Sequence, residues 1–108
     1  MPWVSLCALD ELAEGTGRIV QVEGYELAVF LHGGRASVID NRCPHAGASL
    51  AGGGLDGGFV VCPRHGWAFD LETGRLRGSD VEALRTYPAR LLARRGHRTL
   101  VQAQLPMR

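Results

Sequence analysis

Lysine is missing from this sequence: its 12 basic residues are all arginines, and with 11 acidic residues they leave a formal net charge of +1. A balance this close to neutral gives no reason to expect binding to nucleic acid or to a membrane surface, because both depend on excess positive charge. The basic cluster near the C-terminus lacks the interleaved aromatic residues that single-strand binding requires. We therefore expect a solvated hairpin rather than a binding face at Arg90, Arg94, Arg95 and Arg98.

Long apolar runs are also absent. No stretch approaches the roughly 18 apolar residues that would span a bilayer. The first residues, from Met1 to Ser5, lack the basic and apolar regions of a secretory signal, so we expect a cytoplasmic protein. A chain of 108 residues is long enough for one core and too short for two, which predicts that residues 1–108 form a single domain.

Cysteine is scarce, with three residues that cannot complete a set of disulfides. In a reducing cytoplasm, thiols are more often metal ligands or small buried hydrophobes than bridges. Cys7 alternates with Val4 and Ser5 in the first apolar run, as expected for a buried hydrophobe. Cys43 and Cys62 are therefore the thiols to consider as metal ligands.

Glycine, in contrast, is abundant, with 15 residues that concentrate between Gly47 and Gly78. Outside this segment, short apolar or β-branched runs alternate with glycine-containing turns, which predicts strands at residues 3–7, 18–22, 27–31 and 36–39 and one helical turn within 8–14. We also predict a closing hairpin, formed by residues 85–93 and 99–104, that returns to the first sheet. The expected fold is all-β: an antiparallel sheet or sandwich scaffold (about 1–41 and 79–108) that holds an inserted subdomain of two loops (about 42–78).

Two cysteines and two histidines lie in the glycine-rich segment within two similar sequences. The first is Cys43-Pro44-His45, and the second, after 16 intervening residues, is Cys62-Pro63-Arg64-His65. In both, a proline fixes φ directly after the cysteine, and a glycine just beyond the histidine permits a sharp turn. Loops of this kind are stiff and suited to wrapping a metal centre. We therefore predict Cys43, His45, Cys62 and His65 as metal ligands.

The residue types alone leave the metal open. Two thiolates and two imidazoles would also make a tetrahedral zinc site in a structural module that mediates an interaction. The spacing argues against zinc, because common zinc modules pair two cysteines in one short motif and two histidines in another. Here each loop contributes one of each.

With this motif the chain resembles the Rieske proteins, and more narrowly the soluble Rieske-type ferredoxins and the related small subunits of assimilatory nitrite reductases. The resemblance is strong over residues 43–70, and the flanking strands and the length fit the family across the whole chain. It implies one [2Fe–2S] cluster, with an inner iron on Cys43 and Cys62 and an outer iron on His45 and His65 near the surface.

The same resemblance implies a function. The first interpretation is a diffusible one-electron carrier between a flavin reductase and a terminal oxygenase, and the alternative is a small subunit held by the large subunit of a nitrite reductase. We expect no independent catalysis, because the mononuclear iron of an oxygenase needs two further histidines and a carboxylate in a pocket of their own. Only His32 and His97 remain, and both lie beside glycine in turns, where we expect solvated side chains.

The ligand types also bear on the reduction potential. An oxidised cluster with two thiolates and two neutral imidazoles is formally neutral, so it accepts an electron more readily than a cluster with four thiolates, and the class spans about −150 to +300 mV. Respiratory Rieske proteins add a disulfide between the loops and hydroxyl groups after the second histidine. The matching positions here supply neither, which predicts a potential at the low end of the class: Ala48, Arg64, Trp67 and Phe69.

Two further features of the sequence concern the surface around the loops. Family members often carry a proline-rich loop after the second ligand loop, whereas this chain has Gly78-Ser79-Asp80 and no proline between Pro63 and Pro88, so we expect a looser cover. Arg42 and Arg64 flank the predicted ligands, either as solvated charges or as contacts for an acidic partner.

Overall fold

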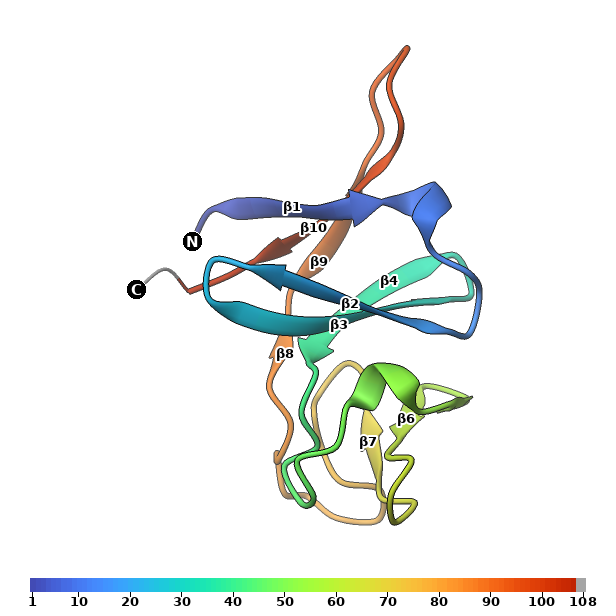
Figure 1. Cartoon of the computed structure of the whole chain (residues 1–108), viewed down its shortest axis with the longest axis vertical. Coiled ribbons are helices and arrows are strands. Elements are labelled where there is room, and N and C mark those ends of the chain that lie inside the picture. Colours follow the sequence, from blue (N-terminus) through green and yellow to red (C-terminus); the bar gives the residue numbers. More distant parts are fainter. Residues whose placement is uncertain (107–108) are drawn as a thin grey trace.

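The computed structural model describes residues 1–106 and contains three antiparallel sheets joined by tight turns (Figure 1). The central sheet has four strands in the order β2 (Gly17–Val22), β3 (Tyr25–His32), β4 (Arg35–Asp40) and β8 (Thr86–Tyr87). A second sheet has the order β1 (Trp3–Ala8), β10 (Leu100–Gln104) and β9 (Ala89–Leu92). The third contains β5 (Leu55–Asp56), β6 (Phe59–Val61) and β7 (Ala68–Asp70). The predicted all-β fold is confirmed.

The only helical segments among residues 1–106 are two short 3-10 turns, η1 (Leu9–Glu11) and η2 (Leu50–Gly52). The first lies where the sequence predicts a helical turn. No helix in this part of the chain is long and apolar enough to cross a membrane.

The predicted closing hairpin is divided at Pro88. Residues 86 and 87 pair with β4, whereas residues 89–92 pair with β10 in the second sheet. Proline has no N–H to donate to a ladder, so a strand cannot continue evenly through that position. The carbonyl of Pro88 still accepts a hydrogen bond from Gln104 at 2.9 Å. The hairpin thus serves two sheets, and its last strand pairs with β1.

Within the central sheet, β3 is buried on both faces because it is apolar along nearly its whole length. Successive side chains of a strand point to opposite faces. Ala28 and Phe30 belong to a core shared with the third sheet, while Leu27 and Val29 belong to a core shared with the second sheet. The strand pair β3 and β4, which leads into the first predicted ligand loop, is therefore packed against a core on each face.

The third sheet and its loops form the lower part of the molecule in Figure 1 and meet the central sheet at a close approach. A methyl group in place of the hydrogen at Gly17 would lie 2.8 Å from the backbone of Ala51 and from the ring of Phe30. Only glycine fits between these elements without a shift of the backbone. The contact fixes η2, and with it the end of the first predicted ligand loop, against β2.

Candidate metal centre

The first loop (residues 43–48) closes through two backbone hydrogen bonds. The N–H of Cys43 donates to the carbonyl of Ala48 at 2.9 Å, and the N–H of Gly47 donates to the carbonyl of Cys43 at 2.8 Å. Gly47 has a φ of 69°, in the left-handed region that favours glycine. An antiparallel bridge between Arg42 and Ser49 joins the base of the loop. The chain therefore reverses sharply around His45.

The second loop (residues 62–67) repeats both hydrogen bonds at the same spacing. The N–H of Cys62 donates to the carbonyl of Trp67 at 2.7 Å, and the N–H of Gly66 donates to the carbonyl of Cys62 at 3.0 Å. Gly66 has a φ of 75°, again in the left-handed region. The two loops thus share one pattern of closure, although the histidine follows its cysteine by two positions in the first loop and by three in the second.

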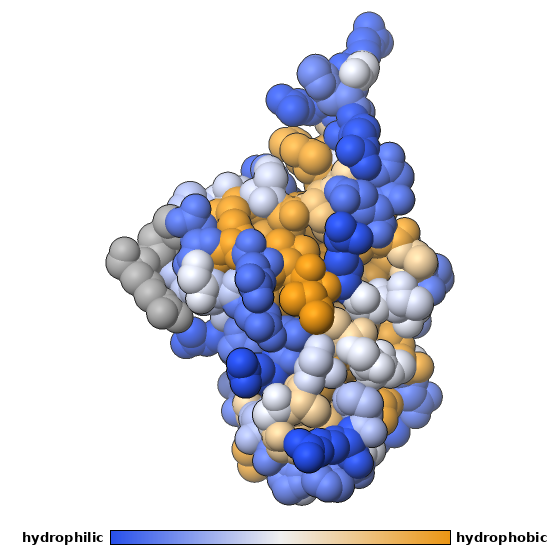
Figure 2. Space-filling view, viewed as in Figure 1, coloured by the Kyte–Doolittle hydropathy of each residue, from blue (hydrophilic) through white to orange (hydrophobic). Residues whose placement is uncertain are grey.

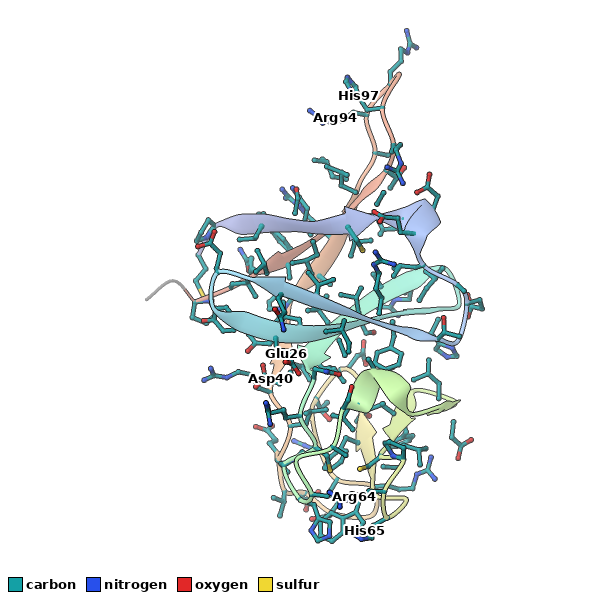
Figure 3. The ribbon with its side chains drawn as sticks, in the orientation of Figure 1. Glu26, Asp40, Arg64, His65, Arg94 and His97 are labelled. Carbon is teal, nitrogen blue, oxygen red and sulfur yellow. The ribbon has the colours of Figure 1, made fainter. Side chains whose placement is uncertain are left out.

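The loops place their thiols inside and their imidazoles outside. Cys43 and Cys62 are 2% and 1% exposed and belong to the same apolar core as Phe69. His45 and His65 are exposed, with ring centroids 5.3 Å apart and ring planes at 68°. Figure 3 shows His65 at the far end of the third-sheet region. The structure therefore brings the four predicted ligands together as a buried pair and an exposed pair.

Backbone N–H groups act on both sulfur atoms. Burial raises the pKa of the Cys43 thiol, and a hydrogen bond from the N–H of Ala46 offsets only part of this effect. Burial also opposes ionisation of Cys62, but hydrogen bonds from the N–H of Arg64 and from the Cys43 thiol bring the pKa of Cys62 below its ordinary value. The backbone N–H groups of the loops thereby favour thiolate, the form of cysteine that binds metals, although burial outweighs them at Cys43.

The four donors are paired by type, two thiols and two imidazoles. Among residues 1–106, no three His, Cys, Asp or Glu side chains converge closely enough to hold a single ion. A cluster of two irons bridged by sulfides instead needs two protein ligands at each iron. Paired thiols and paired imidazoles fit that need better than they fit one tetrahedral ion.

Trp67 has a role that sequence reasoning missed. Its ring stacks on the ring of His45, with centroids 3.8 Å apart and planes at 5°. The side chain is 40% exposed, so the two aromatic rings form one continuous surface. The position of Trp67 just after His65-Gly66 places it in the second loop, and only the mirrored geometry of the loops brings it to the histidine of the first.

Asn41 is a second residue that sequence reasoning missed. It is 1% exposed and uses both its backbone and its side chain to join β3 to the first loop. Its backbone N–H and its amide nitrogen donate to the carbonyl and carboxylate of Glu26 at 3.1 and 2.9 Å. Its amide oxygen accepts from the Ser49 hydroxyl and the Ala51 N–H, and its carbonyl accepts from the Leu50 N–H. The sequence offered one signal for this role: Asn41 is the only asparagine in the chain, and it lies just before the Cys-Pro-His motif.

Three residues that we did not predict as ligands, His32, His97 and Cys7, lie away from the two loops. His32 is exposed, with Nδ1 3.7 Å from a Glu14 oxygen, and His97 is exposed in the β9–β10 hairpin. Cys7 is half-buried against the second core, and burial raises the pKa of its thiol. Both histidine side chains are exposed, as predicted, although His32 ends β3 rather than lying in the turn.

Comparison with known proteins identifies the family. The sequence pattern of the Rieske [2Fe-2S] domain matches residues 2–88. The chain belongs to this family. A [2Fe–2S] cluster is therefore its cofactor, and the predictions of family, fold and cofactor are confirmed. The zinc alternative is set aside on the same finding.

Individual Rieske relatives resemble the chain over nearly its whole length. It is 37% identical over 94 residues to the ferredoxin component of the naphthalene 1,2-dioxygenase system of Pseudomonas aeruginosa, covering 86% of this chain and 90% of that protein. The ferredoxin in a complex with the oxygenase of carbazole 1,9a-dioxygenase has 32% identity and a TM-score of 0.76, covering 94% and 91% of the two chains. The protein described as the NADH-dependent nitrite reductase small subunit of Mycobacterium tuberculosis has 26% identity and a TM-score of 0.81, covering 98% and 97%.

Proposed function

We propose that Cys43 and Cys62 bind the inner iron of the cluster, that His45 and His65 bind the outer iron, and that the chain carries single electrons from a reductase to an oxygenase. The observation that carries the proposal is the division of the four side chains into a buried thiol pair and an exposed imidazole pair. This division matches what a carrier needs, because one end of the cluster must be protected and the other must be reachable by partner proteins.

The residues of the chain have separate tasks in this proposal. The cluster, when bound, supplies the capacity to accept and release one electron. The apolar core around the thiols excludes water, and the N–H groups of Arg64 and Ala46 stabilise negative charge on sulfur. The doubly hydrogen-bonded loops hold the ligands in one geometry, so little rearrangement accompanies electron transfer. His45 and His65 present the edge through which electrons enter and leave.

The proposed partners are a flavin reductase as the donor and a terminal oxygenase as the acceptor. Support comes from the relative in Pseudomonas aeruginosa, which is the ferredoxin component of a dioxygenase system, and from the neighbour found in complex with an oxygenase. We place this carrier in the cytoplasm, where thiols stay reduced and such enzymes meet nicotinamide cofactors.

A second candidate is the small subunit of a nitrite reductase, attached to its large subunit. The observation in its favour is the fit to the mycobacterial small subunit, with a TM-score of 0.81 over nearly all of both chains. The carrier is preferred because sequence identity to the dioxygenase ferredoxin component is higher, at 37% against 26%.

Reconstitution tests the proposal. The purified chain is mixed with NADH and with the reductase and oxygenase of the naphthalene 1,2-dioxygenase system, and oxygenated product is measured. We expect product only when the chain is present, with Cys62→Ala inactive and His32→Ala as active as the unaltered chain. Failure to relay electrons, together with copurification of a nitrite reductase large subunit, would contradict the carrier and support the second candidate.

A further inference from the structure

More than half of the arginines among residues 1–106 are matched with acidic or polar groups. Ion pairs to Asp or Glu are formed by Arg18, Arg35, Arg75, Arg77 and Arg98. Arg90 donates to the side chain of Gln102 and lies over the ring of Trp3. Arg42 and Arg64 are among the remaining arginines: both are exposed, neither side chain has a carboxylate partner among residues 1–106, and these two lie beside the predicted ligands. Positive charge is therefore left uncompensated next to the two ligand loops.

The two loops carry basic residues and no acidic ones. Residues 42–49 and 62–69 contain two arginines and two histidines and no aspartate or glutamate. The chain as a whole has a formal charge of only +1, so the loop face is more positive than the average surface. Figure 3 shows Arg64 beside His65 at the end of the molecule where the imidazoles are exposed. An approaching protein thus meets positive charge at the point where electrons leave.

Trp67 adds an aromatic contact to the same face. It is one of the few large apolar side chains left exposed among residues 1–106, and its stacking on His45 fixes the ring in place. Tryptophan and arginine are the side chains most enriched among residues that dominate binding energy at protein interfaces. A ring already held in position loses little freedom on binding, which favours affinity.

We propose that Arg64 and Trp67, supported by Arg42, are the specificity-determining residues of this carrier, and that they select redox partners whose docking face is acidic. Trp67 makes the central contact, and the arginines steer and orient the approach. In each encounter one electron leaves the reduced chain and is gained by the acceptor group of the partner. The proposal rests on the function proposed above and adds the charge sign of the partner and the residues that recognise it.

The chain provides a matched control at its opposite end. The hairpin between β9 and β10 projects beyond the sheets, and its surface is mostly hydrophilic (Figures 1 and 2). Arg94 lies on this projection, is exposed, and has no carboxylate partner among the described residues (Figure 3). Arg94→Glu therefore changes the net charge as much as Arg64→Glu does, but far from the imidazoles.

The experiment measures electron transfer from the dithionite-reduced chain in a stopped-flow instrument. Two haem proteins serve as probes: cytochrome b5, which has an acidic face around its haem, and cytochrome c, which has a basic one. A neutral quinone serves as a small acceptor without a docking face. Salt weakens attraction between opposite charges and repulsion between like charges, so the sign of the salt effect reports the charge at the contact.

For the unaltered chain we expect the rate with cytochrome b5 to fall with added salt and the rate with cytochrome c to rise. Arg64→Glu should slow the reaction with cytochrome b5 by about 3- to 10-fold at low salt, whereas Arg94→Glu should leave it nearly unchanged. Trp67→Ala should slow it by about 10-fold, and Trp67→Phe, which keeps an aromatic ring, should recover most of that loss.

Equal effects of Arg64→Glu and Arg94→Glu would overturn the docking proposal, since they would show a response to net charge alone. A rate with cytochrome b5 that rises with salt would also overturn it. Failure of the unaltered chain to reduce even the neutral quinone would instead contradict the carrier function. The quinone reaction therefore separates failure of the docking face from failure of electron transfer itself.

Discussion

The rings of His45 and His65 lie 5.3 Å apart at the surface although they belong to different loops. Their meeting follows from the repeated closure of those loops by hydrogen bonds of the same type and spacing. Beneath them the two cysteines meet in the core. Each of the four side chains therefore has its own proposed role as a ligand, and each role can be tested by substitution.

Replacing a proposed ligand should remove the cluster. Cys43→Ala, His45→Ala, Cys62→Ala and His65→Ala should each lose most of the bound iron and acid-labile sulfide, because an iron left with one protein ligand is not retained. The measurement is iron and sulfide content together with visible absorption. His32→Ala and His97→Ala should keep the cluster in full. Full retention in any of the four ligand variants would show that the assignment at that position is wrong.

The reduction potential should lie at the low end of the class range of about −150 to +300 mV. The reason is the set of residues around the loops: Ala48 and Arg64 cannot form a disulfide, and Trp67 and Phe69 provide no hydroxyl to donate to the cluster. A redox titration followed by visible absorption measures the midpoint. A clearly positive midpoint, comparable to respiratory Rieske proteins, would contradict this prediction.

Asn41→Ala should destabilise the junction between β3 and the first loop. The substitution leaves the Ala51 N–H without its acceptor and removes a donor to the Glu26 carboxylate in a buried place. We expect the free energy of unfolding to fall by about 1–3 kcal/mol. Chemical denaturation measures the change. Ser49→Ala, which removes one hydrogen bond from an exposed residue, should cost clearly less, and equal costs would argue against a special role for Asn41.

Two glycines with nearly the same φ provide a matched test of close packing after the second loop. Gly74 has a φ of 76°, and an added methyl group there would lie 1.9 Å from the carbonyl oxygen of Leu84. Gly78 has a φ of 79° with nothing within 4 Å. Gly78→Ala should cost about 1–2 kcal/mol for the left-handed backbone alone, and Gly74→Ala should cost more. Similar melting temperatures for the two variants would contradict this packing.

Stability should decline in alkali because of Tyr87. Burial, reinforced by its hydrogen bond to Asp40 at 2.6 Å, raises the pKa of this tyrosine above its ordinary value of 10.0. Above about pH 10 the unfolded chain releases a proton that the folded chain keeps, so folding becomes less favourable as pH rises, by at most about 1.4 kcal/mol per pH unit. Denaturation between about pH 9 and pH 11 should show a smaller decline for Tyr87→Phe than for the unaltered chain. Equal declines would contradict the prediction.

The sequence predicts the parts of this fold that depend on local pattern. Strand positions follow from the alternation of apolar runs and glycine turns, and the donor loops follow from the repeated Cys-Pro sequence. The division of the closing hairpin could also have been foreseen, because Pro88 cannot donate to a sheet ladder.

Two contacts at the site that the sequence does not predict join segments that are separated along the chain. The hydrogen bonds of Asn41 reach β3 and the end of the first loop at once, and the stacking of Trp67 on His45 joins one loop to the other. Contacts of this kind depend on how the sheets pack, which no local pattern encodes.

The assignment of two histidines to one iron is tested most directly by electron paramagnetic resonance of the dithionite-reduced protein, with histidine labelled with nitrogen-15. The account predicts an anisotropic signal with an average g below the free-electron value, and hyperfine coupling to two histidine nitrogens that is reduced to one in His45→Ala or His65→Ala if any cluster remains. A signal without histidine coupling, or a colourless protein that binds one zinc ion per chain, would contradict it.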